Sequence, residues 1–342
     1  MSDSQPRNET PGAEGTDRAS ARGSGKRRKG RHPEATPEDD QLLRPRFLAP
    51  QHWPFWAGMG LLRAVTALPH GARMAVGRTL GRLFWVFGRD RRKVALRNLE
   101  LCFPELSKGE RRRIARENFA SLGCGVIEIG MAWWTPDDEL DELVEVEGEE
   151  HLREAMAGGD GLLLLTCHMT CQELGGRIVS RLAPLHVLYR EDNNPVVATF
   201  VRRCRRSHAK DVIANSDMRG MVRALRGGEL IWYAPDQNVR PRRGGIFAPF
   251  FGIEASTTPA AARLAERTGC RVLPYYPVRT ERGYRLVFEP VLEDFPGGDS
   301  LEEATARMNA TLERWIRAHP EHYFWVHKRF KTRPEGEPEI YP

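Results

Sequence analysis

The stretch Gly161-Leu-Leu-Leu-Leu-Thr-Cys167, followed by His168-Met-Thr-Cys-Gln-Glu173, decides the fold. An uninterrupted apolar run of this length is typical of a strand that is buried on both faces of a parallel sheet. A helical pattern begins at Leu174, so His168 is predicted at the strand end or turn and Glu173 in the first helical turn. Ligand sites in open α/β sheets form beyond the carboxyl ends of the strands. The stretch therefore predicts a functional site next to a buried strand.

Similar apolar runs alternate with helical patterns from about Val144 to the end of the chain. Strands are predicted at 162–167, 185–189, 229–234, 271–278 and 284–288. Helices are predicted at 172–181, 195–208, 218–226, 259–267 and 301–319, and Ser107-Lys-Gly-Glu110 is a capping box that opens a further long helix. This alternation predicts right-handed βαβ units, and hence an α/β fold with a mostly parallel central sheet flanked by helices.

Composition limits the classes of partner. The 342 residues carry a formal charge of +6, which favours phosphate groups, nucleic acid or an anionic membrane. The six cysteines form no CxxC pair, so they are interpreted as reduced cytosolic thiols. The basic run from His327 to Pro334 contains Phe330 and would suit nucleic acid, but no helix-turn-helix, RNP or zinc-finger pattern accompanies it. No nucleic-acid partner is expected.

The first ninety residues divide into two parts. Residues 1–46 have no apolar periodicity and include Lys26-Arg27-Arg28-Lys29, so they are predicted to be a disordered basic tail. Residues 47–90 are predicted to form a membrane-associated helical segment, with residues 91–342 as the catalytic domain. The apolar stretch 54–69 is too short to span a bilayer and contains Arg63. Basic segments that carry tryptophan favour interfacial seating over a complete crossing, and the alternative is two ordinary surface helices.

His168 and Glu173 are the first candidate catalytic residues. A carboxylate beside a neutral imidazole holds one tautomer and leaves the other ring nitrogen free to accept a proton. Cys167 and Cys171 flank this histidine and offer two alternatives, a metal site or a cysteine nucleophile. The remaining histidines show no metal-ligand spacing, so no metal is predicted.

Polar residues after the neighbouring strands complete the candidate site. Arg190 and Asn194 follow the second predicted strand, Arg205 lies on the next helix, and Asp236 and Gln237 follow the third strand. Arginines at such positions bind phosphate or stabilise the oxyanion of a tetrahedral intermediate, although at helical spacing they also form a solvated face. The candidate substrate-binding residues are Arg190, Asn194, Gln237, Arg177, Lys328 and Arg329.

Several ordered segments between about Phe47 and Tyr341 resemble the bacterial lipid A biosynthesis acyltransferases, specifically the late lauroyl/myristoyl transferases. The segments are Arg97-Asn-Leu-Glu-Leu-Cys-Phe-Pro-Glu105, Gly130-Met-Ala-Trp-Trp134, the HxxxxE box at His168–Glu173 with Leu174-Gly-Gly-Arg177, Tyr189-Arg190, Trp232-Tyr-Ala-Pro-Asp236 and Phe330-Lys-Thr-Arg-Pro-Glu-Gly336. The HxxxxE box alone is a weak pattern, but ordered segments over nearly three hundred residues are specific. The tail before Arg44 lies outside the resemblance.

The resemblance implies an enzyme at the cytoplasmic face of the bacterial inner membrane, without a cofactor. Its donor would be acyl–acyl carrier protein, and its acceptor a hydroxyl on the hydroxyacyl chains of a Kdo-bearing lipid A precursor in lipopolysaccharide biosynthesis. The resemblance makes His168 the general base and Glu173 its carboxylate partner. It also makes Arg205 and Asp236 site residues.

Three alternatives to this function remain at the level of sequence. A lysophospholipid or glycerol-phosphate acyltransferase would have the same fold. This chain, however, has Glu173 where those enzymes usually carry aspartate, and it lacks their Phe-Pro-Glu-Gly segment. A covalent cysteine enzyme and a non-catalytic membrane-binding protein are the other two.

Overall fold

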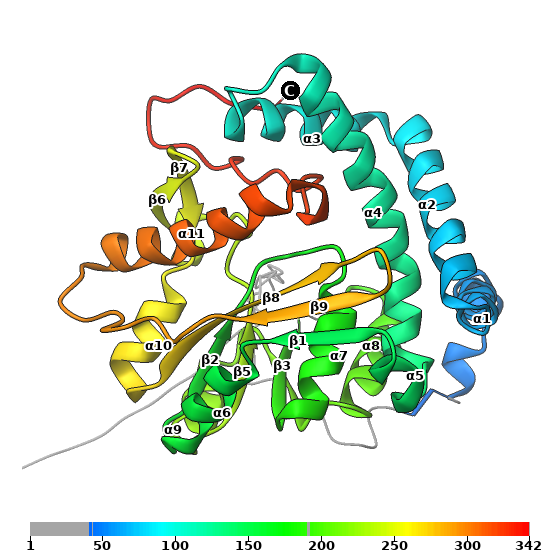
Figure 1. Cartoon of the computed structure of the whole chain (residues 1–342), viewed down its shortest axis with the longest axis horizontal. Coiled ribbons are helices and arrows are strands. Elements are labelled where there is room, and N and C mark those ends of the chain that lie inside the picture. The colour runs from blue at the N-terminus through cyan, green and yellow to red at the C-terminus, as the bar shows by residue number, and fades with distance from the viewer. Residues whose placement is uncertain (1–40, 43, 190–191, 342) are drawn as a thin grey trace, which may run out of the picture. The chain divides into compact units, whose positions relative to one another are not determined.

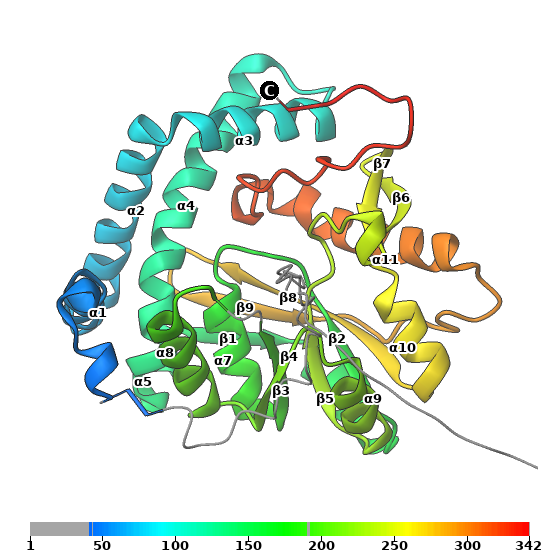
Figure 2. The same cartoon turned by 180° about the vertical axis from the view of Figure 1, so that it is seen from behind.

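The computed structural model describes residues 41–42, 44–189 and 192–341. Most of the predicted basic tail and Arg190 therefore lie outside the described residues. Those that are described belong to one unit, residues 40–342. Figure 1 shows a central sheet with helices on both sides, and Figure 2 shows the same arrangement from behind.

A seven-stranded sheet forms the centre, in the order β1-β9-β8-β2-β5-β3-β4. All its neighbouring strands pair in parallel except β8 and β9, which are antiparallel. The predicted mostly parallel sheet is confirmed. The strands are β1 (Val144–Glu147), β2 (Leu162–Leu165), β3 (Leu185–Tyr189), β4 (Asp211–Ala214), β5 (Leu230–Tyr233), β8 (Arg271–Arg279) and β9 (Tyr284–Phe288).

Two hydrophobic clusters cover the two faces of the sheet. In β2, Leu162 and Leu164 face one cluster and Leu163 and Leu165 the other, so all four leucines are buried. The first face packs against α6 and α7 and the second against α9, α10 and α11. These helices are α6 (Glu149–Ala157), α7 (Gln172–Leu182), α9 (Met218–Arg226), α10 (Ala260–Thr268) and α11 (Leu301–Ala318), and α8 (Pro195–Arg206) links β3 to β4.

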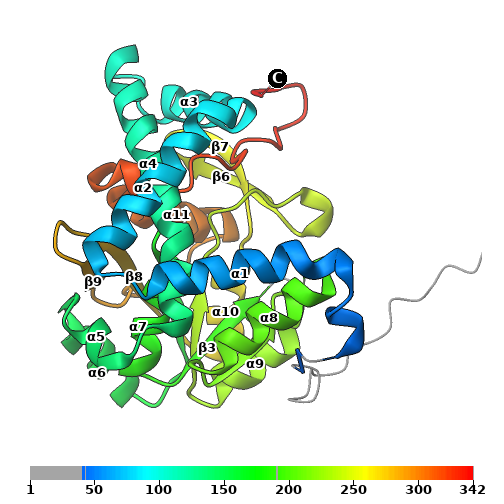
Figure 3. The same ribbon diagram turned by 90° about the vertical axis from the view of Figure 1, so that its right-hand side faces the viewer.

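Helices α1 (Trp53–Thr66) and α2 (His70–Phe87) lie on the outer side of α4 (Lys108–Trp134), as Figure 3 shows. The predicted capping box at Ser107 and Glu110 opens α4. Gly77 and Gly81 let α2 approach α4 closely, since a Cβ at Gly81 would lie 2.1 Å from the carbonyl oxygen of Phe119. In the described ranges, no helix has both the length and the hydropathy that crossing a membrane requires.

Apart from short 3-10 helices, six elements were not assigned as such from the sequence. These are α3 (Arg89–Cys102), the strand β1, the helix α6, the edge strand β4, and the hairpin of β6 (Ile246–Phe250) and β7 (Ile253–Thr257). The hairpin turns at Phe251 and Gly252, which both have positive φ. Phe250 in this hairpin is fully buried and packs near Phe330, so it belongs to the core.

A buried ion pair joins α4 to the β8–β9 hairpin. The guanidinium of Arg279 donates to both carboxylate oxygens of Glu128 at 2.6 Å, and the Tyr284 hydroxyl donates to the same carboxylate at 2.9 Å. The Arg279 and Glu128 side chains are 9% and 1% exposed. Arg279 also donates to Ser121, so the charges of this seam are satisfied by protein groups alone.

Candidate active site

His168 lies three residues beyond the end of β2, at the carboxyl edge of the sheet. The backbone between the strand and α7 is fixed by neighbours, because the Thr166 amide donates to the Tyr233 carbonyl and the Thr170 amide to the His322 carbonyl. Met169 also forms a bridge with Tyr323. The predicted position of His168, between a buried strand and a helix, is confirmed.

Asp236 is the carboxylate that contacts His168. Strands β2 and β5 are parallel neighbours with Leu165 opposite Tyr233, so residues three positions beyond each strand end reach the same place. His168 Nδ1 and Asp236 Oδ1 are 2.6 Å apart, and the His168 backbone amide donates to Asp236 Oδ2 at 3.1 Å. The His168 side chain is 24% exposed and that of Asp236 only 1%.

The charge of Asp236 is stabilised by these contacts. Burial raises the pKa of this carboxyl group, but the His168 ring and its hydrogen bonds outweigh burial and lower the pKa to about 2. Tyr323 adds a side-chain hydrogen bond to the same carboxylate. An ionised Asp236 that accepts from Nδ1–H leaves Nε2 of His168 as the nitrogen that can accept a proton.

Glu173 does not contact His168, and its predicted role as the direct partner of this histidine is wrong. It lies in the first turn of α7, as predicted, but its carboxylate is paired with Arg205 on α8, with distances of 2.9 and 2.6 Å to Nε and Nη2. The Trp133 indole donates to the same carboxylate at 3.4 Å. Burial raises the pKa of Glu173, but Arg205 more than compensates, so the pKa is lowered. The position beside His168 is occupied by Asp236 because that residue follows the adjacent strand.

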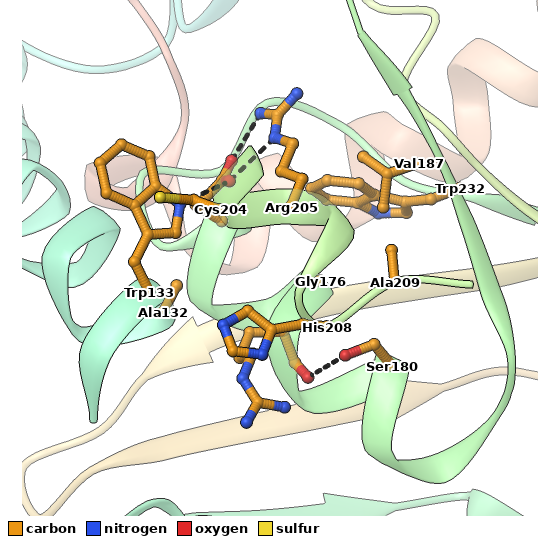
Figure 4. A pocket seen from close by; sticks show the side chains of 12 residues that line it. Ala132, Trp133, Gly176, Ser180, Val187, Cys204, Arg205, His208, Ala209 and Trp232 are labelled. Carbon is orange, nitrogen blue, oxygen red and sulfur yellow. Dashed lines mark hydrogen bonds and ion pairs between the residues drawn. The ribbon is translucent and has the colours of Figure 1, made fainter. Parts of the chain in front are cut away.

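A small pocket of about 20 Å³, enough for about one water molecule, lies against this second pair (Figure 4). Glu173 and Arg205 line one side, and the rings of Trp133 and Trp232 line the walls. His208 lies at the opposite side of the pocket from Arg205, and Arg177 also belongs to the lining. The full lining is Ala132, Trp133, Glu173, Gly176, Arg177, Ser180, Val187, Cys204, Arg205, His208, Ala209 and Trp232. His168 and Asp236 lie outside it, so the two ion pairs face different surroundings.

The predicted substrate-binding residues lie in different surroundings. Arg329 is 2% exposed and donates to the Ser256 carbonyl and the Thr257 hydroxyl, which contradicts a contact with substrate. Asn194 caps α8 by accepting from the Val196 amide at 3.1 Å. Arg177 pairs with Asp137 and lines the pocket, and Lys328 lies over the Tyr341 ring. Gln237 is half-buried directly beyond Asp236.

Two further residues at the site were not singled out from the sequence. Trp133 reaches Glu173 from the end of α4, and Tyr323 reaches Asp236 from the segment after α11. The sequence signal for both was an aromatic cluster: Trp133-Trp134 was used only as part of the resemblance, and Tyr323-Phe-Trp325 directly precedes the basic run that was considered for nucleic acid.

The cysteines next to His168 do not suit covalent catalysis. Cys167 is fully buried and Cys171 is 1% exposed. Burial raises the pKa of the Cys171 thiol to about 12 and that of Cys167 well above its usual range, which disfavours the thiolate. Among the described residues, His319, Glu321 and His322 form the one group close enough to share a metal ion, and it contains neither cysteine.

Comparisons with known proteins identify the family of the chain. Residues 42–332 match the family described as bacterial lipid A biosynthesis acyltransferase. The chain is 40% identical to the lipid A biosynthesis lauroyltransferase of Escherichia coli (strain K12), over 86% of this chain and 97% of that protein. It is 38% identical to the palmitoleoyltransferase and 28% identical to the myristoyltransferase of the same strain, which cover 86% and 90% of this chain and 96% and 95% of those proteins.

The chain therefore belongs to the bacterial lipid A biosynthesis acyltransferases, and it is an acyltransferase of lipid A biosynthesis. Among solved structures, it is similar to the crystal structure of the 1-acyl-sn-glycerophosphate acyltransferase PlsC from Thermotoga maritima. The TM-score is 0.35 and the identity 13%, over 77% of this chain and 97% of that one. This likeness is too weak to bear on the substrate.

Proposed function

We propose that the enzyme transfers a fatty acyl chain from acyl–acyl carrier protein to a hydroxyl of a lipid A precursor, with His168 as the general base. The observation that carries this proposal is the contact between His168 Nδ1 and Asp236 Oδ1 at 2.6 Å, in which the aspartate is buried and the imidazole remains accessible. Nε2 removes the proton as the acceptor hydroxyl attacks the thioester carbonyl. Asp236 then stabilises the imidazolium that forms.

In this mechanism the tetrahedral intermediate collapses with release of the carrier thiol, and the imidazolium returns the proton to the departing sulfur. The bond that forms is the ester C–O bond, and the bond that breaks is the thioester C–S bond. Direct attack needs no acyl-enzyme, in agreement with the burial of Cys167 and Cys171. Donors at the oxyanion contribute on the order of 10²–10³-fold each.

Arg205 and Glu173 act as a positioning pair in this proposal. Arg205 donates from Nε and Nη2 to Glu173, so its third guanidinium nitrogen, Nη1, can donate to an oxyanion or a substrate carbonyl. The Arg205 and Glu173 side chains are 20% and 14% exposed, which leaves the pair in reach of a ligand in the pocket. Because this small pocket combines aromatic walls with a charged rim, we propose that it contacts a polar group of a substrate rather than enclosing the whole molecule.

Replacing His168 tests the mechanism. His168→Ala should lower kcat by about 10²–10⁴-fold, because general base catalysis supplies that much. The measurement is transfer of labelled acyl groups from acyl carrier protein to a lipid A precursor, with lysophosphatidate offered in parallel. His151→Ala on α6 is the matched control and should keep full activity. A His168→Ala enzyme with unchanged kcat would overturn the mechanism, and preferential acylation of lysophosphatidate would overturn the acceptor.

We also propose that α1 and α2 seat the enzyme in the interface of the inner membrane, at its cytoplasmic face. Leu80, Leu83, Phe84 and Phe87 follow the spacing of one helix face and are 42%, 49%, 39% and 77% exposed. The adjacent face of α2, with Gly77 and Gly81, packs on α4, and Phe84 at the edge of the stripe also contacts Phe119 of α4. Arg78 and Arg82 are also exposed, on another face of α2, and basic residues on such a helix favour anionic lipid surfaces.

Flotation with vesicles that contain anionic lipid tests this seating. Leu83→Ser combined with Phe87→Ser should reduce the vesicle-bound fraction several-fold, because two large apolar groups no longer enter the bilayer. Met156→Ser combined with Met218→Ser is the control, since both methionines are exposed on other helices at 39% and 42%. Equal loss of binding in the two double variants would contradict the assignment to α2.

A further inference from the structure

Three arginines project from the turn between β5 and β6. Arg240 precedes a short 3-10 helix, Pro241–Arg243, and the side chains of Arg240, Arg242 and Arg243 are all exposed. A fourth arginine, Arg263 in the first turn of α10, lies against the same turn: its Nη1 is 3.8 Å from the position that a Cβ on Gly244 would occupy. These four residues are called the arginine cluster below.

The turn that carries the cluster is held in one conformation. The amides of Arg243 and Gly244 donate to the carbonyls of Arg240 and Pro241 at 2.8 Å, and Gly244 has φ of 86°. On the side of the active site, the Val239 amide donates to the Ser256 carbonyl at 3.2 Å. The arginines are thus presented from a closed turn, which lowers the entropy that would be lost when they bind a ligand.

The protein itself does not neutralise this charge. Within the described part of the chain, no carboxylate forms an ion pair with any member of the cluster. Arg263 also lies near a helix N-terminus, where the helix dipole disfavours a cation and favours an anion, and the first turn of α10 contains no acidic residue. The four guanidinium groups of the arginine cluster, without carboxylate partners, form a site of strongly positive potential.

The cluster is continuous with the active site. Asp236, which contacts His168, precedes Arg240 by four residues, so their Cα atoms are at most about 14 Å apart. Between them, the Asn238 amide donates to His327 Nε2 at 3.1 Å, and the Asn238 side chain exchanges hydrogen bonds with Thr332. A sugar headgroup with its substituents is therefore large enough to reach from His168 to the cluster.

We propose that the arginine cluster binds a phosphate group on the sugar headgroup of the lipid acceptor, an inference that rests on the proposed function. Guanidinium forks bind phosphate oxygens in pairs, and arginine is preferred over lysine where such planar recognition matters. A small corner of four arginines suits a compact polyanion. A protein partner needs roughly 800 Å² on each side, which one turn and one helix end do not offer. The cluster thus orients the acceptor while His168 activates its hydroxyl.

The test crosses a change in the protein with a change in the lipid. Wild type and Arg242→Gln/Arg243→Gln are assayed with the lipid A precursor and with the same precursor after removal of its phosphates. Arg219→Gln/Arg282→Gln, which removes two exposed arginines elsewhere, is the matched control. For wild type, we expect dephosphorylation to raise the acceptor KM about 10- to 100-fold. The Arg242/Arg243 variant should show this higher KM with both lipids, with kcat and the donor KM unchanged.

Each other result decides against the proposal. An unchanged acceptor KM in the Arg242/Arg243 variant overturns it, and a higher KM for acyl carrier protein alone assigns the cluster to the carrier instead. Equal effects of dephosphorylation on wild type and variant would place the phosphate site elsewhere. Competition by 10 mM inorganic phosphate as strong as that by the lipid would reduce the cluster to a site for the free anion. If wild type transfers no acyl group to any lipid, the proposed function fails, and equilibrium binding of the two lipids still tests the cluster by the same comparison.

Discussion

Two buried carboxylates, Asp236 at the sheet edge and Glu128 in the seam between α4 and the β8–β9 hairpin, have opposite surroundings. Both are about 1% exposed and both accept hydrogen bonds from a cationic or titratable side chain. The partner of Glu128 is Arg279, which is itself buried and makes all its contacts with protein groups. The partner of Asp236 is His168, whose ring is 24% exposed. The Glu128 carboxylate therefore stabilises the fold, whereas the Asp236 carboxylate orients an accessible side chain that can contact a substrate.

The pair of Glu173 and Arg205 lies between these extremes. It is bidentate, as the pair of Arg279 and Glu128 is, but it also lines a pocket, as an active-site group does. Geometry of the ion pair alone therefore does not separate structural from functional pairs. Structural and functional ion pairs are distinguished by the exposure of the carboxylate's partner and by the free space beside the pair.

The largest effect in this comparison should come from Asp236→Asn. The amide cannot hold the Nδ1–H tautomer of His168 as the carboxylate does, nor can it stabilise the imidazolium. We expect kcat to fall about 10²–10⁴-fold while the fold is retained, because His168 keeps its place between β2 and α7. Steady-state transfer assays measure kcat, and circular dichroism checks the fold. Activity within threefold of wild type would mean that Asp236 plays no part in catalysis.

Glu128→Gln should have the reverse profile. It leaves Arg279 buried without a counter-charge, and breaking a buried pair in this way destabilises a protein by about 3–5 kcal/mol. We expect the urea midpoint to fall by the corresponding amount, while kcat per folded molecule stays within about twofold. The double variant Glu128→Leu/Arg279→Met should recover part of the loss, since no charge then stays unpaired. A large loss of kcat in the folded fraction would show that the seam contributes to catalysis.

The pH dependence of stability should reveal the contact between Asp236 and His168. The pKa of Asp236 is lowered to about 2 in the folded protein, below the usual value of 3.8, so the folded state binds this proton less readily than the unfolded state. The contribution of Asp236 to stability is therefore complete above pH 4 and is lost as the pH falls through about 2. It is on the order of 2 kcal/mol. Urea titrations between pH 5.5 and 2.5 should show a shallower acid-side decline for Asp236→Asn than for wild type. Parallel curves would contradict the assigned shift.

The sequence predicts the alternation of strands and helices because each buried strand and amphipathic helix carries its own periodicity. The strand β3 and the helix α9 have the predicted bounds, and β2 and β5 differ from prediction only at their ends. The strand β4 was not predicted, because its four residues at the edge of the sheet include the exposed Asp211 and give too short an apolar run. Membership in the family and the choice of His168 likewise followed from local motifs.

The partner of His168 could not be predicted from local patterns. The spacing from His168 to Glu173 suggested a contact within one segment, but the contact that forms depends on β5 being the neighbour of β2. Sheet order is a property of the whole fold, and Asp236 is 68 residues away along the chain. Arg329 teaches the same point, because a basic run predicts exposure, yet this guanidinium is buried against Ser256 and Thr257.

The smallest effect should come from Tyr284→Phe, which isolates the neutral hydrogen bond of the seam from its ion pair. The Tyr284 hydroxyl donates to Glu128 at 2.9 Å and is buried. Its removal leaves Glu128 with both bonds from Arg279, so no charge is left unpaired and the loss should be about 1 kcal/mol. Equilibrium urea unfolding would measure it, with Tyr189→Phe, on the half-buried end of β3, as the control. A loss as large as that of Glu128→Gln would mean that the hydroxyl, rather than the guanidinium, holds the carboxylate in place, and the contrast between the seam and the sheet edge would then rest on the wrong pair of atoms.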